Sequence, residues 1–324
     1  MFNITTIGDS MVDTFVVIDH EEAKLQCDIK REHCLLCLNY ADKIPVKKTD
    51  QALGGNACNV AVGTQKLGLK TALLTELGDD LNGLVIKEGL EKTNVNTEYV
   101  KMLPNQETRY SIVLNYLGER TTLSYYTKKT YQNATIPQSQ WLYYTSLGQN
   151  FTRVQEKIIK YLAKYPNTKL AVNPGSLQLK NSLNNFKKIL KFTDLLFVNK
   201  EEAEKITGNN GKITELIKRL HKLGVKNIVL TDSTNGSYAS NGQELYKMAL
   251  YPTTLVEKTG AGDAYASGFL ASWHYNEDLY QAMCWGTANA AGVISKIGAQ
   301  AGLLNKNQIT KLINKNSNIK PKLI

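Results

Sequence analysis

The chain has 324 residues, of which 42% are hydrophobic, 21% charged and 8% aromatic. This ordinary globular composition excludes a disordered chain, a collagen-like repeat and a small disulfide framework. No run of 18 apolar residues occurs, and the first residues lack a basic segment followed by an apolar stretch. We therefore expect no membrane span, no secretory signal and a cytoplasmic location.

The net charge is basic, because 39 Lys and Arg against 29 Asp and Glu give +10. Only five of these cations are Arg, the side chain suited to bidentate contacts with bases and phosphates. The lysines are spread along the chain in nothing longer than pairs. This pattern favours solvated faces over a nucleic-acid surface, so we expect no nucleic-acid partner.

The five cysteines form an odd and sparse set. In a cytoplasmic chain we expect them to be reduced thiols. Cys34 and Cys37, with His33 beside them, suggest a metal site, but no second pair of ligands follows at a suitable spacing. The two leucines between these cysteines favour packing over metal or redox chemistry.

The first 128 residues predict strands and helices that alternate around an insertion, from apolar periodicity and turn residues. In chain order the predicted elements are a strand ending at Gly8, an inserted hairpin or flap at about 20–50, a helix from Gly54 to Gly68, a buried strand at 71–78, a helix to about Lys92 and a β-hairpin at 108–128.

The rest of the chain alternates more regularly. The predicted elements are strands starting at Trp141, Lys169, Asp194 and Asn227, with helices at 152–164, 182–190, from Glu201 and at 212–222. Such alternation is typical of βαβ units. We predict an α/β fold over residues 1–324, one doubly wound domain with a mainly parallel central sheet and helices on both faces. Segments 10–50 and 97–128 would add a small β excursion.

The strongest chemical signal is the segment Lys258-Thr-Gly-Ala-Gly-Asp263. Aromatic residues at every fourth position from Tyr265 to Trp273 predict an amphipathic helix after it. The bare backbone at 260–262 would then offer free N–H groups to an anion at the helix N-terminus. Asp263 beside that site could take the proton of a hydroxyl that attacks phosphorus. The alternative is that Asp263 only stabilises the first helical turn.

A second loop, with Gly54 and Gly55, opens the helix that carries Asn56 and Asn59. Paired glycines let a ligand approach the backbone closely, and amides three residues apart could bind its hydroxyl groups. A glycine turn with an asparagine cap explains the same residues.

Two other strand ends carry polar residues. Asp9 and Asp13 follow the first strand, and either carboxylate could bind vicinal hydroxyls. Asn199 and Glu202 follow the strand at 194–199, where Mg²⁺ held through water beside phosphates would need them. The same pair has the spacing of a capping box, which is the structural alternative.

Two common phosphate-binding motifs are excluded. Residues 208–213 lack the spacing and the hydroxyl of a Walker A loop. A dinucleotide fingerprint starting at Gly260 would need glycine where Tyr265 stands.

These loops, in this order, resemble the signatures of the ribokinase family, also called the PfkB carbohydrate kinases. Residues 54–68 and 78–83 are similar to the N-terminal signature, and residues 257–264 to the C-terminal one. Asn199 and Glu202 are similar to the family's phosphate and magnesium motif. The match covers essentially the whole chain. It implies a phosphotransferase that uses ATP and Mg²⁺ and acts on a sugar or nucleoside hydroxyl.

The resemblance also implies roles for single residues. Asp263 would be the general base, with the N–H groups of Gly260, Ala261 and Gly262 as the anion hole. The other matching positions are Asp13, Gly54, Gly55, Asn56 and Asn59 for the substrate, Asn199, Thr231, Gly236 and Asn289 for the nucleotide, and Glu202 for Mg²⁺ through water. The segments 10–50 and 97–128 would form a β-sheet lid that excludes water. Lid hairpins can also join two protomers into a homodimer.

The chain departs from the family's pattern in places. Glu257-Lys-Thr259 stands where many members have Asp-Thr-Thr, whose Asp helps to ligate a monovalent cation. We expect the ammonium of Lys258 to weaken any need for K⁺. Asn56 replaces a lysine of ribokinases proper, so the resemblance does not specify ribose.

The leading function is therefore an ATP-dependent kinase of a small sugar. A nucleoside kinase is the first alternative, since Tyr125, Tyr126 and Tyr131 could stack on a base, although such residues are also common in packed β-structure. A non-catalytic module that senses sugars or nucleotides on the same fold is the second.

Overall fold

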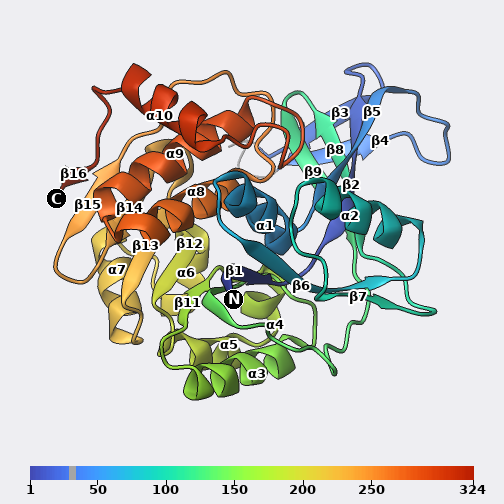
Figure 1. The fold of residues 1–324 in the computed structure, drawn as a ribbon. Helices are drawn as coiled ribbons and strands as arrows, with labels where there is room; N and C mark the ends of the chain where they lie inside the picture. Colours follow the sequence, from blue (N-terminus) through green and yellow to red (C-terminus); the bar gives the residue numbers. More distant parts are fainter. Residues whose placement is uncertain (29–33) are drawn as a thin grey trace.

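The computed structural model describes residues 1–28 and 34–324. A ten-stranded sheet lies at its centre with helices on both faces, and a small separate sheet projects from one side (Figure 1). The large sheet contains, in spatial order, β7 (Val100–Leu103), β6 (Thr71–Gly78), β1 (Phe2–Ile7), β10 (Ser139–Tyr144), β11 (Lys169–Val172), β12 (Leu195–Asn199), β13 (Asn227–Thr231), β14 (Ser237–Ser240), β15 (Leu245–Met248) and β16 (Lys322–Leu323). Strands β7 to β13 in this order are parallel, and the last three are antiparallel. The predicted doubly wound fold is confirmed.

Helices cover both faces of this sheet (Figure 1). One side holds α1 (Asn56–Lys66), α2 (Leu81–Lys92), α8 (Ala261–Asn276), α9 (Leu279–Ile294) and α10 (Lys306–Lys315). The other holds α3 (Phe151–Lys164), α4 (Ser176–Asn181), α5 (Leu183–Leu190), α6 (Lys200–Thr207) and α7 (Ile213–Lys222).

The two cores follow from the twofold period of a strand. In β10, Trp141 and Tyr143 pack in the core beneath α8 and α9, whereas Leu142 and Tyr144 pack in the core beneath α3 and α5. Because successive side chains point to opposite faces, a strand covered on both sides needs a continuous apolar run. This is why the uninterrupted apolar segments of the sequence predict these strands well.

The small sheet has the order β5 (Val46–Gly54), β2 (Met11–Ile18), β8 (Tyr110–Tyr116) and β9 (Glu119–Tyr125). We call these four strands the lid sheet. A hairpin of β3 (Ala23–Cys27) and β4 (Cys34–Leu38) is inserted between β2 and β5. The predicted lid segment 97–128 was too long at its start, because β7 pairs with β6 at the edge of the large sheet.

Helix α8 differs from the amphipathic helix that the sequence predicts. Every residue from Asp263 to Trp273 is buried, so no face of this stretch is turned to water. The aromatic rings of Tyr265, Phe269 and Trp273 stack along one side. Apart from Leu270, the positions between them are small, and Gly268 lets the backbone of α9 approach closely at Trp285. A helix packed on all sides has no polar face to predict.

The expectation of five reduced thiols was wrong for two of them. The antiparallel register of β3 and β4 places Cys27 opposite Cys34, and the two form a disulfide. Cys37, Cys58 and Cys284 are free. His33 lies outside the described residues, and no cluster of three or more metal-ligating side chains occurs in residues 1–28 and 34–324. Among these residues, no helix has the length and apolar character needed to cross a bilayer.

Candidate active site

A cavity of about 390 Å³ opens at the carboxyl ends of β12 and β13, between the N-terminus of α8 and the lid sheet. In open parallel sheets, ligands bind at this edge. Of the predicted site residues it is lined by Asp13, Gly55, Asn56, Asn59, Asn199, Glu202, Thr231, Gly260, Ala261, Gly262 and Asp263. Residues far apart in the sequence therefore meet here.

The N-terminus of α8 forms one wall. Gly260 has a positive φ of 77°, and a Cβ atom there would lie 2.4 Å from the Cβ atom of Ala299. Only glycine fits this position without strain. No side chain caps the helix. The N–H group of Ala261 makes a long contact of 3.4 Å with the carbonyl of Lys258, while those of Gly262 and Asp263 have no carbonyl partner in the described chain. This end can hold an anion.

Asp263 lies beside these N–H groups and is only 7% exposed. The amide of Asn59 donates a hydrogen bond of 2.8 Å to Oδ2 of Asp263. Asn59 is itself held by Gln300, whose amide donates to it at 3.0 Å. Burial, with a smaller contribution from the Asp13 carboxylate, raises the pKa of Asp263 to about 6. The side chain is thus oriented, and it can accept a proton near neutral pH.

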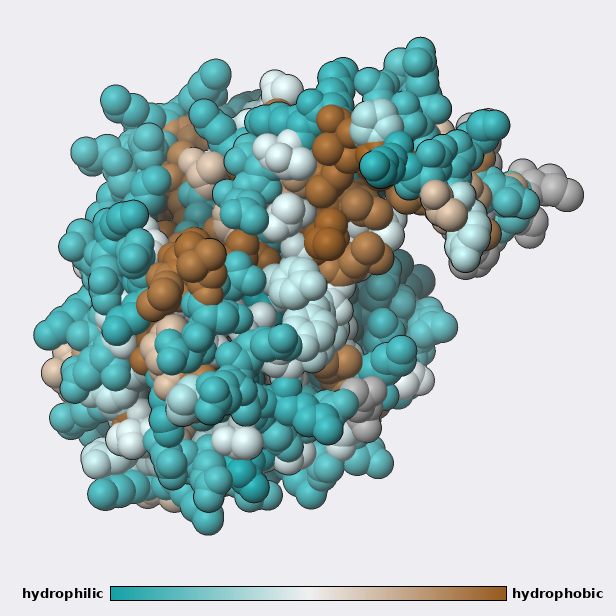
Figure 2. All heavy atoms as spheres, turned by 90° about the vertical axis from the view of Figure 1, so that its right-hand side faces the viewer, coloured by the Kyte–Doolittle hydropathy of each residue, from teal (hydrophilic) through white to brown (hydrophobic). Residues whose placement is uncertain are grey.

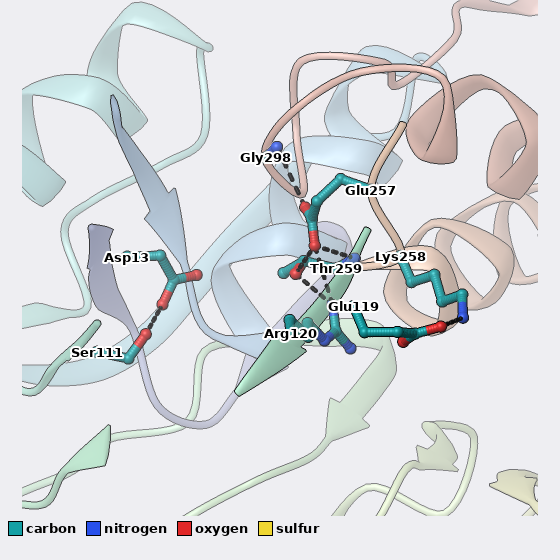
Figure 3. Close-up of polar contacts among 8 residues, drawn as sticks. All are labelled: Asp13, Ser111, Glu119, Arg120, Glu257, Lys258, Thr259 and Gly298. Atoms are coloured by element: carbon teal, nitrogen blue, oxygen red, sulfur yellow. Dashed lines mark hydrogen bonds and ion pairs between the residues drawn. The ribbon is translucent and has the colours of Figure 1, made fainter. Parts of the chain in front are cut away.

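Asp13 comes from β2 of the lid sheet and also lines the cavity. The hydroxyl of Ser111 on β8 donates to Oδ1 of Asp13, as Figure 3 shows. Burial raises the pKa of Asp13. Gly54 lies against this carboxylate, since a Cβ atom there would be 2.0 Å from Oδ2 of Asp13. Gly54 therefore leaves room for Asp13 and is not itself part of the cavity wall.

Asp9, the other carboxylate after the first strand, is engaged elsewhere. The guanidinium of Arg109 donates to its Oδ2 atom at 2.5 Å, and the hydroxyl of Tyr131 donates to its Oδ1 atom at 3.2 Å. Of the two carboxylates that could bind vicinal hydroxyls, the structure leaves Asp13 facing the cavity.

Asn199 and Glu202 form a reciprocal capping box at the start of α6. The backbone N–H of Asn199 donates to Glu202 at 2.9 Å, and the Glu202 N–H donates back to the Asn199 side chain at 2.8 Å. Both residues also line the cavity, so their role in holding Mg²⁺ stays a prediction beside the capping role that the structure shows. Burial raises the pKa of Glu202 to about 7.

A magnesium ion fits this corner of the cavity. The Glu202 carboxylate is desolvated, and a cation nearby would favour its ionised form. Because the described residues offer no cluster that could enclose a metal directly, the ion would depend on water and on phosphate oxygens, as Mg²⁺ commonly does.

Two predicted nucleotide residues do not line this cavity. Asn289 is fully buried: its amide donates to the Ala264 carbonyl and the Ser267 hydroxyl and accepts from Leu304 N–H. It joins α9 to α8 and has no free polar group for a nucleotide. Gly236, with a φ of 91°, ends a short helical turn and packs against Met248.

The sequence reasoning missed several polar residues of the wall. The lid sheet contributes Ser111, Arg120, Thr122 and Ser124, while Arg109 lies just before β8 and Asn173 just after β11. They lie in segments whose Ser, Thr and Tyr content predicts only β-structure. For the residues of the 108–128 hairpin, the one feature of the sequence that could have indicated a role in the site was the assignment of that hairpin to a lid.

The turn before α8 is joined to the lid sheet by two ion pairs (Figure 3). The ammonium of Lys258 lies 2.7 Å from Glu119, and the guanidinium of Arg120 lies 3.2 Å from Glu257. We expected the ammonium of Lys258 to lie near the position of Glu257. This was wrong, because the positive charge next to Glu257 comes from Arg120. A monovalent cation at Glu257 would have to compete with the Arg120 guanidinium.

We predict on this basis that K⁺ activates the enzyme by less than about twofold, because Glu257 is already neutralised at short range. Turnover would be measured in KCl and in tetramethylammonium chloride at equal ionic strength. Several-fold activation by K⁺ would contradict the prediction.

Comparisons with known proteins identify the family of this chain. A family model described as pfkB family carbohydrate kinase matches residues 15–306. The chain belongs to the PfkB family of carbohydrate kinases. Among curated relatives of this PfkB kinase, the 5-dehydro-2-deoxygluconokinase of Lacticaseibacillus casei is 24% identical over 81% of the chain and 86% of the relative.

Solved structures show the same fold. The PfkB kinase superposes on the nucleoside kinase of Methanocaldococcus jannaschii, an archaeal member of the ribokinase family, with a TM-score of 0.80, 21% identity and coverage of 98% and 99% of the two chains. For the ribokinase of Arabidopsis thaliana, solved with ribose and ATP, the TM-score is 0.78 with 18% identity and coverage of 96% and 98%. The PfkB kinase thus has a ribokinase-like fold.

Proposed function

We propose that this PfkB kinase transfers the γ-phosphoryl group of ATP to a hydroxyl group of a small neutral sugar. The observation that carries the proposal is the position of Asp263. Its carboxylate is oriented by Asn59 at the cavity wall, next to the N–H groups that begin α8. A proton acceptor and an anion site side by side are what transfer to an alcohol requires.

In the proposed reaction, Asp263 accepts the proton of the acceptor hydroxyl while the alcohol oxygen forms a bond to phosphorus. The bond between the γ-phosphorus and the bridging oxygen breaks, and ADP leaves with that electron pair. The N–H groups at the start of α8, from residues 260–262 and Asp263, stabilise the charge on the transferring group. Asp13 holds other hydroxyls of the acceptor. Glu202 would hold Mg²⁺ through water. When bound, the ion would neutralise negative charge on the phosphates.

A neutral acceptor is supported by the cations of the cavity wall. Within the described chain, Arg109 pairs with Asp9, Arg120 with Glu257 and Lys258 with Glu119. An acceptor with its own carboxylate or phosphate would have to compete for the two arginines and leave a buried carboxylate, Asp9 or Glu257, unpaired, which is costly.

A sugar is favoured over a nucleoside by the lid residues that face the cavity. Ser111, Thr122 and Ser124 are small and polar, Met11 and Val113 are the apolar ones, and no aromatic ring of the lid sheet lines the cavity in the described chain. The tyrosines considered for base stacking lie elsewhere: Tyr131 is buried against Asp9, Tyr126 covers Arg109, and Tyr125 packs on Tyr110.

The test is an ADP-release assay over neutral pentoses and hexoses, sugar acids, sugar phosphates and nucleosides. We expect a neutral sugar to exceed every charged sugar and nucleoside by at least about tenfold in kcat/KM. Equal or higher values for a charged acceptor or a nucleoside would refute the proposed substrate class. No turnover by the wild type over the whole panel would favour the sensing module.

A homodimer through the lid stays a prediction. Strand β9 is an edge of the lid sheet with all seven residues exposed, and unpaired edges can accept a second strand. In Figure 2 the lid sheet and its β3–β4 hairpin project from the main body, and hydrophobic side chains gather at the base of this projection. Light scattering should give twice the chain mass, and a monomer at all concentrations would contradict it.

A further inference from the structure

Strand β9 of the lid sheet docks on the turn that leads into α8. In Figure 3 the side chains of Glu119 and Arg120 extend to residues 257–259. The guanidinium of Arg120 lies 3.2 Å from Oε1 of Glu257 and also donates to the hydroxyl of Thr259. These residues are about 137 positions apart in the sequence, so the contact exists only when the lid sheet lies over this turn.

The contact with Arg120 matters for the stability of the turn, because the carboxylate of Glu257 is only 5% exposed. It accepts hydrogen bonds from the N–H and the hydroxyl of Thr259, and a long one of 3.4 Å from the N–H of Gly298. A buried carboxylate is costly unless it is hydrogen-bonded, and a nearby cation offsets more of that cost. Among the described residues, Arg120 is the one cation in ion-pair contact with it.

Thr259 directly precedes Gly260, the left-handed residue at which the free N–H groups of α8 begin. Arg120 and Glu257 both bind the Thr259 hydroxyl. Together they fix the last residue before the anion site. The position of those N–H groups therefore depends on a side chain that the lid supplies.

We propose that Arg120 is a positioning residue for phosphoryl transfer, which closes an ion pair with Glu257 and thereby holds the 257–260 turn in its anion-binding conformation. This inference rests on the proposed function and adds a coupling to it. Asp13 and Ser111, which face the acceptor, lie in the same lid sheet as Arg120. Acceptor binding and completion of the phosphate site thus become one event, and transfer to water is suppressed while the lid is open.

The test compares Arg120→Ala with Glu119→Gln. The control, Glu119→Gln, removes the neighbouring ion pair to Lys258 and leaves Glu257 untouched. The side chain of Glu119 is 75% exposed. We expect Arg120→Ala to lower kcat by about tenfold to a hundredfold, because a displaced anion site costs rate more than affinity. The Kd for ATP without acceptor should change less than about twofold, and Glu119→Gln should keep kcat within about twofold.

A readout independent of turnover is amide hydrogen exchange at residues 258–263. Acceptor and a non-hydrolysable ATP analogue should slow it in the wild type and in Glu119→Gln but not in Arg120→Ala. Ethylguanidinium should restore part of the lost kcat of Arg120→Ala, and Arg120→Lys should lie between alanine and wild type, because it keeps the charge without the planar fork.

The inference is overturned if Arg120→Ala keeps kcat within about threefold of wild type. It is also overturned if its loss comes with a lower Tm and no rescue, or if exchange at 258–263 is the same in all variants. A wild type that phosphorylates nothing in the panel would instead overturn the proposed function. The two failures are therefore distinguishable.

Discussion

Asp263→Asn should lower kcat by about 10²–10⁴-fold while the Kd values for ATP and acceptor change little, since the amide keeps the shape of the side chain but cannot accept the proton. Asn59 donates to Oδ2 of Asp263, and the asparagine oxygen can still accept that bond. The orientation of the side chain should therefore survive. Single-turnover kinetics and calorimetric binding would separate the chemical step from binding.

The pH dependence follows from the same carboxylate. Burial raises the pKa of Asp263 to about 6, and the proposed base must be ionised. Turnover should therefore be constant above that pKa and fall about tenfold for each pH unit below it. Stability runs in the opposite direction. A folded-state pKa above the unfolded value means that ionisation costs more in the folded protein, so the carboxylate destabilises it at neutral pH.

This opposite sign supplies a control for Asp263→Asn. At pH 7.5 its Tm should equal or exceed that of the wild type, because the variant buries no charge. At a pH below 4 the two proteins should differ less, since both side chains are then neutral. A large loss of Tm at pH 7.5 would mean that the variant is inactive through misfolding. Full activity of Asp263→Asn would remove the general base from the mechanism.

The sequence predicts those parts of the protein that depend on local patterns. Apolar runs such as those of β10 and β12 identify strands buried on both faces. The glycines before Asp263 identify a bare helix N-terminus, since side chains are absent there by composition. Both inferences need only a few neighbouring residues, and the fold confirms them.

Features that depend on long-range packing could not be predicted in this way. Asn59 was assigned to the substrate, yet its amide binds Asp263, because α1 packs against α8 across 204 residues of sequence. The resemblance assigns Asn289 to the nucleotide, yet its partners are a backbone carbonyl and a serine hydroxyl of α8 and the N–H group of Leu304. The Cys27–Cys34 disulfide depends on the register of a hairpin, which the composition of that segment does not specify.

Gly262→Val should lower kcat/KM for ATP by about 10²-fold with little change in stability, because its side chain would enter the space that the proposal assigns to the transferring phosphate. A Cβ atom at Gly262 would meet nothing within 4 Å, and the residue lies in helix α8 at the cavity wall. The folded protein therefore tolerates a side chain there. The smaller Gly262→Ala should stabilise the helix by about 0.5–1 kcal/mol and still lower activity.

Gly260→Ala, two residues earlier, is the matched variant. It should act by straining the fold, whereas Gly262→Val should act by blocking the site. Its φ of 77° and the 2.4 Å approach to Ala299 mean that any Cβ atom strains the fold. We expect this variant to lose about 2–4 kcal/mol of stability as well as activity, from the left-handed backbone and the overlap together. Chemical denaturation and ATP kinetics on the three variants distinguish a blocked site from a distorted one. If Gly262→Val binds and turns over ATP like the wild type, the phosphate does not sit at this end of α8, and the bare glycine backbone serves packing alone.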